Sequence, residues 1–238
     1  MDNKFFIKEQ WNKKEYQELI KYLLSKEKKE LKNFNSKIIN TKQIIIGIET
    51  KTLRDIAKYI AKGNIIEFLD NTENTYFEET LIEGFVISYI KEEEIFKKYF
   101  YKFINKVDNW ATCDMCISSF KIIKNLNFYN ESKKLVSQDN EFISRIGLII
   151  LLYYYIDEKH IDDILKYISK INTKYYYVNM AISWLISASF IKHRTNTLEL
   201  LKQKKLPIFV QNKAISKIRD SYQVSKEDKE LVKQYKLN

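Results

Sequence analysis

Two tryptophans, an aspartate and an arginine occur at spacings that could place them on one surface. Asp114 follows Trp110 by four residues, so one helical turn would put both on the same face. Arg145 and Trp184 follow at related positions later in the chain. Aromatic faces attract positive charge and a carboxylate neutralises it, so this set suits a flat, cationic ligand. The alternative for each tryptophan is ordinary packing in the core.

The elements that would position these side chains are helices that repeat. Five apolar segments each contain one small residue at an equivalent position, and the intervals between these residues are 32, 31, 34 and 33. The small residues are Gly84, Cys116, Gly147, Ala181 and Ala214. Such a period, with two helices per unit, is typical of an α-solenoid, and small residues let neighbouring helices approach closely. We therefore predict an all-α fold, an α-solenoid superhelix.

Inner helices are expected near residues 78–90, 109–123, 142–155, 176–190 and 210–221. The positions two residues before the small residues are Ile82, Asp114, Arg145, Asn179 and Asn212. Asp114 and Arg145 would face each other across adjacent helices. They fit either an exposed functional face or a buried ion pair between helices, and their spacing does not decide between the two.

The N-terminal segment, residues 1–46, does not follow the repeat. We expect one charged helix over 15–31 and a second helix that begins near Lys51 or Thr52, with Thr50 or Thr52 as its N-cap. The repeats then occupy residues 47–225, residues 226–238 form a C-terminal tail, and residues 1–238 are expected to be a single domain.

Composition and charge exclude several classes of protein. One proline and four scattered glycines argue against turn-rich β folds and Gly-rich phosphate loops. The formal charge of +10 favours a polyanionic partner, nucleic acid before an acidic membrane surface, although a drift toward lysine needs no partner.

The two cysteines, Cys113 and Cys116, are expected to pack in the core rather than to bind a metal, because no second pair of ligands exists. No cofactor is expected. We expect no signal peptide, and the longest apolar run, 11 residues, is too short to span a membrane, so a cytoplasmic location is expected. We also expect the protein to be a monomer.

Four segments together resemble the DNA alkylation repair family of HEAT-like-repeat DNA glycosylases. They are Asp108-Asn-Trp-Ala-Thr-Cys-Asp114, Phe142-Ile-Ser-Arg145, Val178-Asn-Met-Ala-Ile-Ser-Trp184 and Asn212-Lys-Ala-Ile-Ser-Lys-Ile-Arg219. The resemblance spans roughly residues 35–225. It implies that Asp114 is the catalytic carboxylate, that Trp110 and Trp184 are its aromatic partners, and that Arg145 contacts a DNA phosphate. On the same surface we expect Asn179, Asn212 and Lys213 to contact DNA.

The resemblance also implies the reaction. Such enzymes are monofunctional N-glycosylases that remove cationic alkylpurines, 3-methyladenine and 7-methylguanine, from double-stranded DNA. A carboxylate aimed at the anomeric carbon would stabilise the oxocarbenium-like sugar that forms as the base departs. The family does this without drawing the base into a deep pocket.

One departure from the family supports an alternative function. Family members have a glutamine before Thr-Pro at the start of an N-terminal helix, whereas this chain has Glu49 before Thr50-Lys51. An acid beside DNA is less favourable than an amide. The alternative is therefore a HEAT-like-repeat protein that binds DNA but excises weakly or not at all; a basic protein-interaction solenoid is a third possibility, which the retained tryptophans and acid disfavour.

Overall fold

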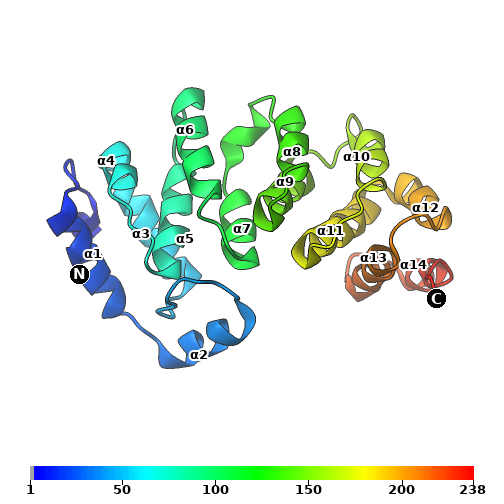
Figure 1. The fold of residues 1–238 in the computed structure, drawn as a ribbon, viewed down its shortest axis with the longest axis horizontal. Coiled ribbons are helices and arrows are strands. Elements are labelled where there is room, and N and C mark those ends of the chain that lie inside the picture. The colour runs from blue at the N-terminus through cyan, green and yellow to red at the C-terminus, as the bar shows by residue number, and fades with distance from the viewer. Residues whose placement is uncertain (1–2) are drawn as a thin grey trace. The chain divides into compact units, whose positions relative to one another are not determined.

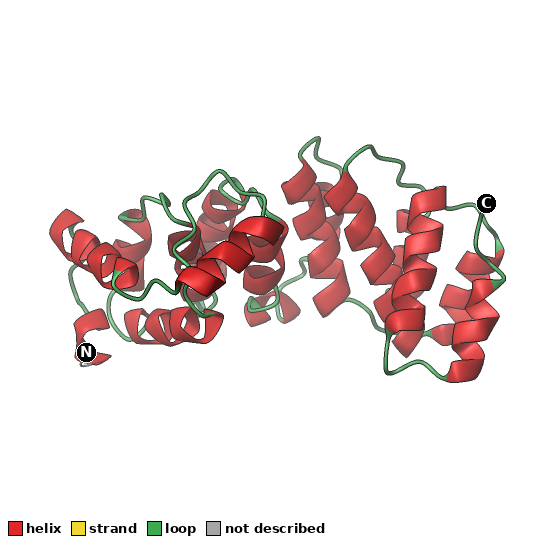
Figure 2. Cartoon of the chain, turned by 90° about the horizontal axis from the view of Figure 1, so that it is seen from below, coloured by secondary structure: helices red, strands yellow, loops and turns green. Residues whose placement is uncertain are grey.

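The computed structural model describes residues 3–238, and within them every regular element is a helix (Figure 2). A single isolated bridge pairs Ile44 with Tyr76 in parallel. The chain forms two compact units, the first ending at Leu126 and the second beginning at Asn127. Each unit is described separately below. No helix among residues 3–238 is both long enough and apolar enough to cross a bilayer.

The first unit contains seven α-helices and two short 3-10 helices. Its elements are η1 (Asn3–Phe6), α1 (Lys13–Leu24), α2 (Lys29–Ile38), α3 (Thr50–Ile60), α4 (Ile65–Asp70), α5 (Phe77–Ile87), α6 (Glu93–Ile104), α7 (Trp110–Ile117) and η2 (Lys121–Lys124). Helices α3, α5 and α7 pack side by side in that order, and α4 and α6 pack against α5 (Figure 1). α6 is amphipathic: Phe96, Phe100 and Phe103 are buried, whereas Glu93 and Lys97 form an ion pair at the surface.

The second unit repeats this two-layer arrangement. Its helices are α8 (Tyr129–Val136), α9 (Glu141–Tyr154), α10 (Ile161–Ile168), α11 (Tyr176–Lys192), α12 (Arg194–Lys202), α13 (Ile208–Asp220) and α14 (Lys226–Lys233). Helices α9, α11 and α13 pack side by side, while α8, α12 and α14 cover α9, α11 and α13 respectively. The prediction of an all-α, solenoid-type fold is confirmed.

The small residues of the repeat lie where neighbouring helices meet. A Cβ atom on Gly84 would collide with the Cys116 side chain of α7 and with Phe103 of α6. A Cβ atom on Gly147 would collide with the backbone of Ser132 in α8. The expectation that these positions allow close helix approach is therefore confirmed at both glycines.

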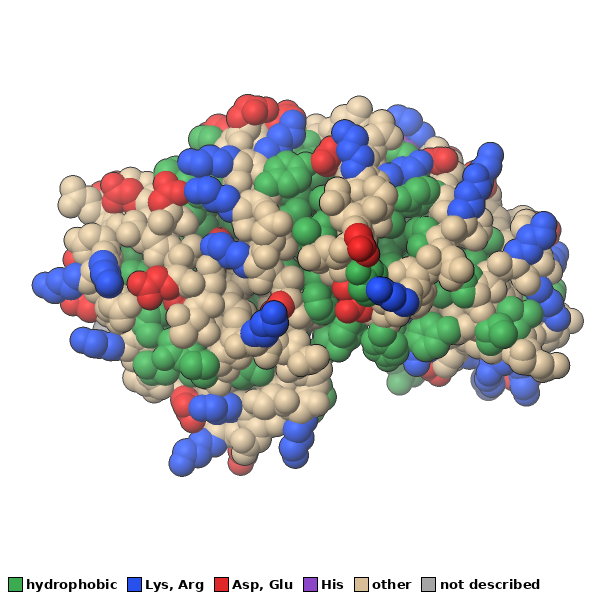
Figure 3. All heavy atoms as spheres, in the orientation of Figure 1, with side chains coloured by type: hydrophobic (Ala, Val, Ile, Leu, Met, Phe, Trp, Pro, Cys, Tyr) green, Lys and Arg blue, Asp and Glu red, His purple; other side chains and the backbone are tan. Residues whose placement is uncertain are grey.

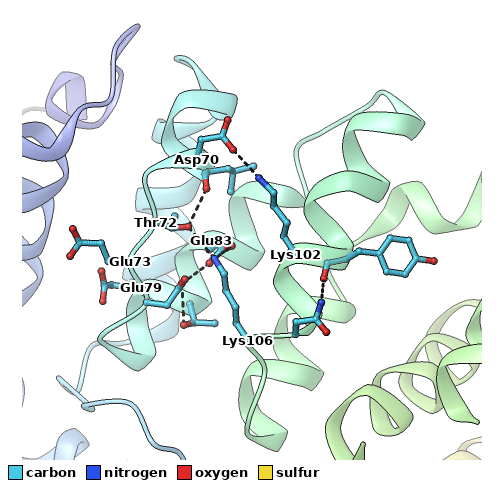
Figure 4. Close-up of polar contacts among 12 residues, drawn as sticks. Asp70, Thr72, Glu73, Glu79, Glu83, Lys102 and Lys106 are labelled. Carbon is cyan, nitrogen blue, oxygen red and sulfur yellow. Dashed lines mark hydrogen bonds and ion pairs between the residues drawn. The ribbon is translucent and has the colours of Figure 1, made fainter. Parts of the chain in front are cut away.

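Helix α5 is buried along its whole length although it contains three glutamates, and each of them has partners. Both carboxylate oxygens of Glu78 accept hydrogen bonds from the backbone N–H groups of residues 46–48, at 2.7–3.3 Å. The Glu79 carboxylate accepts a hydrogen bond from the Tyr16 hydroxyl at 2.6 Å. Glu83 pairs with Lys106 at 2.8 Å, as the dashed line in Figure 4 shows. These bonds tie α1, the residues that follow α6 and the segment before α3 to α5.

Three expectations about helix boundaries are wrong. Residues 15–31 do not form one helix, because α1 ends at Leu24 and α2 begins at Lys29. Helix α3 begins at Thr50 and its N-cap is Glu49, whose side chain makes no capping bond. α7 ends at Ile117 rather than near residue 123, and a 3-10 turn at 121–124 follows it.

Candidate functional site

Helix α7 begins at Trp110 because Asn109 caps it. The Asn109 Oδ1 accepts a hydrogen bond from the backbone N–H of Thr112 at 2.8 Å, and its amide Nδ2 donates to the Thr112 hydroxyl and to Asp108, both at 3.0 Å. Asn109 is itself buried. The cap therefore fixes the position of the first turn, which contains the first predicted site residue.

The segment after α2 holds this first turn from the other side. Asp108 accepts hydrogen bonds from the Thr41 hydroxyl at 2.7 Å and from the Lys42 backbone N–H at 2.8 Å. The Trp110 indole Nε1 donates to the carbonyl oxygen of Ile38 at 3.1 Å. The Trp110 ring is thus anchored at its polar edge.

Asp114 lies one turn after Trp110, and both side chains are half-buried while Cys113, Cys116 and Ile117 between and beyond them are fully buried. The two predicted site residues therefore share the side of α7 that is open to solvent, as their spacing predicts. Burial raises the pKa of the Cys116 thiol, which disfavours a reactive thiolate and agrees with the expected packing role of this cysteine.

The second unit contains the remaining predicted residues, and the aromatic one among them, Trp184, lies on α11. Its half-buried ring contacts Tyr153 of α9 edge to face, with 6.0 Å between the ring centroids. It lines a cleft of about 330 Å³ together with Ser187, Ala188, Ile191, Lys217, Asp220 and Ser221. An aromatic wall beside a lysine is a surface that could pack against a sugar or a base.

Arg145 is buried in α9, at 5% exposure. One guanidinium nitrogen donates to the carbonyl oxygen of Tyr177 at 2.7 Å, and Glu141 accepts the Tyr177 backbone N–H at 2.7 Å. Arg145 and Glu141 thereby hold the first turn of α11 against α9. A contact of Arg145 with a DNA phosphate stays a prediction.

The polar residues of α11 and α13 bind other parts of the second unit. The Asn179 amide nitrogen donates to the Thr173 carbonyl at 3.0 Å, while its buried Oδ1 has no partner among residues 3–238. Asn212 exchanges two hydrogen bonds with the backbone of Leu237, at 2.8 and 2.9 Å, and so fixes the end of the chain. Lys213 is half-exposed. The Asn212 amide keeps one further N–H and one further oxygen lone pair, and a DNA contact by it stays a prediction.

The predicted site is therefore divided between the units, with Trp110 and Asp114 in the first and the other predicted residues in the second. Within the first unit Trp110 and Asp114 are brought to one face. That the residues of the two units together form one site stays a prediction.

The sequence analysis did not single out two charged residues of the first unit, Lys28 and Arg54, that lie beside the N-cap of α3 and on α3 itself. Lys28 forms an ion pair with Glu49, and this contact lowers the pKa of the Glu49 carboxyl. Arg54 of α3 donates to the carbonyl oxygen of Met115 and to the hydroxyl of Ser119, at the end of α7. The sequence contains one signal for Arg54: it lies one helical turn after Thr50, in a helix that was expected there.

On one face of the molecule, basic side chains are spread out rather than gathered on one element (Figure 3). On the face shown in Figure 3, lysine and arginine side chains alternate with acidic ones over both units. The formal charge of +10 thus comes from many exposed lysines.

Comparison with known families places most of the chain within one family model. A family model described as DNA alkylation repair enzyme matches residues 16–218. Neither the curated proteins nor the solved structures contain a significant match. The matched range includes the whole of α7, α9 and α11 and all the predicted site residues.

Proposed function

This chain belongs to the DNA alkylation repair enzyme family, which gives it a role in DNA repair, and on that premise we propose that it is a DNA glycosylase. Its substrates are duplex DNA sites with cationic alkylpurines, 3-methyladenine and 7-methylguanine. The reaction is a monofunctional N-glycosidic cleavage by a monomer in the cytoplasm, without a metal or cofactor.

The chemistry follows from the charge of the substrate. Alkylation makes the purine a cation and hence a good leaving group, and its departure leaves positive charge at the anomeric carbon. Asp114 is the carboxylate that stabilises this charge and positions the attacking water. Trp110 and Trp184 pack against the deoxyribose and stabilise the cationic transition state through their ring faces. Arg145, Asn179, Asn212 and Lys213 are the proposed contacts to the DNA.

The observation that supports this proposal most is the placement of Trp110 and Asp114. Both are half-buried on one side of α7, and the first turn of that helix is fixed by the Asn109 cap and by the hydrogen bonds of Asp108 and Trp110. A carboxylate that acts electrostatically must be preorganised, because reorganisation during the reaction would cost the stabilisation it supplies.

The test is the release of free 7-methylguanine from methylated duplex DNA. Asp114→Asn keeps the shape of the side chain and removes its charge, so we expect the excision rate to fall on the order of a hundredfold or more. Duplex affinity should stay the same or rise, because one negative charge near the DNA is lost. Asp55→Asn, at an exposed position of α3, is the matched control and should excise normally. An Asp114→Asn variant as active as wild type would end the assignment.

A second function, DNA binding with weak or no excision, is supported by Glu49. The carboxylate is 55% exposed at the start of α3, where the family has an amide. Lys28 compensates its charge without removing it. A wild-type protein that binds alkylated duplex and releases no base would favour this function, and recovery of base release in Glu49→Gln would identify Glu49 as the cause.

A further inference from the structure

A basic cleft lies in the first unit between α3 and the turns that follow α5 and α7. Its volume is about 570 Å³, and three of its lining residues are cations, Arg54, Lys91 and Lys121. The serines at 88, 118 and 119 and Asn125 add hydroxyl and amide groups, and no acidic residue lines it. A cleft with this lining attracts anions.

Arg54 is held in a fixed orientation at this cleft. Its guanidinium group lies over the Phe85 ring, 4.0 Å from the centroid, and donates to the Ser119 hydroxyl at 2.9 Å and to the Met115 carbonyl at 3.3 Å. No carboxylate among residues 3–238 is within ion-pair distance of it. A guanidinium has five N–H donors, so donors remain for a ligand.

The two lysines differ from others in the same unit. Lys102 and Lys106 pair with Asp70 and Glu83, as Figure 4 shows. Lys91 and Lys121 are exposed, and within the described part of the chain neither forms an ion pair. Their charges are therefore not paired with a carboxylate of the protein and are available to a bound anion.

The cleft begins one helical turn after Asp114, the predicted catalytic residue. Ser118, which lines it, follows Asp114 by four residues, and its backbone N–H bonds to the Asp114 carbonyl at 3.2 Å. We propose that this cleft binds a phosphodiester group of the DNA backbone, with Arg54 as the oriented donor and Lys91 and Lys121 as counter-charges. Tyr89, 39% exposed, supplies an apolar wall for the adjoining sugar. The inference rests on the proposed function, because it assumes a DNA ligand.

The test compares two double variants of the full chain. Lys91→Ala/Lys121→Ala removes two charges from the cleft, whereas Lys13→Ala/Lys14→Ala removes two exposed charges from α1. Duplex affinity is measured against salt concentration, with and without 7-methylguanine in the DNA. We expect the slope of log affinity against log salt to be smaller by about 1 for each cleft lysine, equally for both duplexes. We expect the α1 variant to keep the wild-type slope.

Chemical restoration of the charge at position 121 separates the loss of charge from any effect of the substitution on folding. Lys121→Cys should lose the same increment of slope, and aminoethylation of the new thiol should restore it, because the product is a lysine analogue. The native Cys113 and Cys116 are buried and should not react.

Each outcome separates the two proposals. If wild type binds duplex and excises 7-methylguanine but the cleft variant matches the α1 variant, the cleft assignment is wrong and the proposed function stands. If inorganic pyrophosphate binds wild type and not the cleft variant while duplex affinity is unchanged, the cleft takes a small anion and the DNA assignment is overturned. If wild type does not bind duplex, both proposals fail.

Discussion

The indole of Trp110 donates a hydrogen bond to the Ile38 carbonyl oxygen at 3.1 Å, which joins the first residue of α7 to the last residue of α2. Trp110 therefore has two roles that mutation can separate: its ring face is available at the candidate site, and its Nε1 fixes where that face lies. The Asp108 bonds to Thr41 and Lys42 reinforce the same junction.

Trp110→Phe keeps an aromatic face and loses the hydrogen bond. We expect the free energy of unfolding to fall by about 0.5–1.5 kcal/mol and excision to slow less than in Trp110→Ala, which removes the face as well. Urea unfolding and base release measure the two effects. Tyr222→Phe, at a fully exposed position, is the control. Equal loss of excision in Trp110→Phe and Trp110→Ala would show that the ring face contributes nothing.

Gly84→Ala should destabilise the first unit, because its new Cβ would collide with the Cys116 side chain. Overpacking of this kind costs about 1–3 kcal/mol in the free energy of unfolding. Cys116→Ala removes the sulfur atom, so the double variant should be more stable than the sum of the single effects predicts. The control is Gly84→Ala combined with Cys113→Ala, which removes a buried thiol elsewhere on α7. Additive effects in both pairs would contradict the contact.

The features predicted correctly from sequence depend on local spacing. The repeat predicts inner helices near 142–155 and 176–190, which are observed as α9 and α11, and the equivalence of Gly84 and Cys116 follows from the same repeat. Trp110 and Asp114 share a face because four residues make one turn. None of these inferences needs a contact between distant residues.

The errors concern features set by long-range bonds. A charged segment such as residues 15–31 has no apolar pattern that shows where a helix stops. The chain turns between α1 and α2, where the backbone N–H of Lys28 donates a hydrogen bond to the Gly47 carbonyl at 3.1 Å. The hydrogen bonds between Asn212 and Leu237, 25 residues away, are a further long-range feature with no local signal, and the predicted DNA contact of Asn212 stays a prediction. A polar residue on an inner helix can serve the fold or the ligand, and only its partners distinguish the two.

Stability should depend on pH through Glu79. Burial raises the pKa of this carboxyl, although the Tyr16 hydroxyl donates to it. A folded pKa above the unfolded value means that the native state binds the proton more tightly. The contribution of Glu79 to stability is therefore greatest below about pH 4.5 and is lost as pH rises through the raised folded pKa.

Glu79→Gln is neutral at every pH and isolates this effect. We expect the stability of wild type relative to Glu79→Gln to decrease as pH rises above about 4.5, measured as the difference in urea midpoint at each pH. Glu158→Gln, at an exposed position of the second unit, should show a smaller change. A difference that increases with pH would mean that the carboxylate is better solvated in the folded state than its burial indicates.

Arg145 allows the two interpretations of a buried arginine to be separated. Its bond to the Tyr177 carbonyl holds α11 against α9, so Arg145→Ala should lower the free energy of unfolding by about 1.5–3 kcal/mol. If Arg145 also contacts a phosphate, duplex affinity should fall equally with and without 7-methylguanine, because phosphate contacts position the protein without reading the base.

The affinity of the Arg145→Ala variant is measured at a temperature at which it is fully folded. Arg194→Ala, which breaks an ion pair with Asp228 in the same unit, controls for loss of a positive charge. A folded Arg145→Ala protein that binds both duplexes like the Arg194→Ala control would assign Arg145 to helix packing alone, while a loss confined to the alkylated duplex would place it at the lesion instead of the backbone.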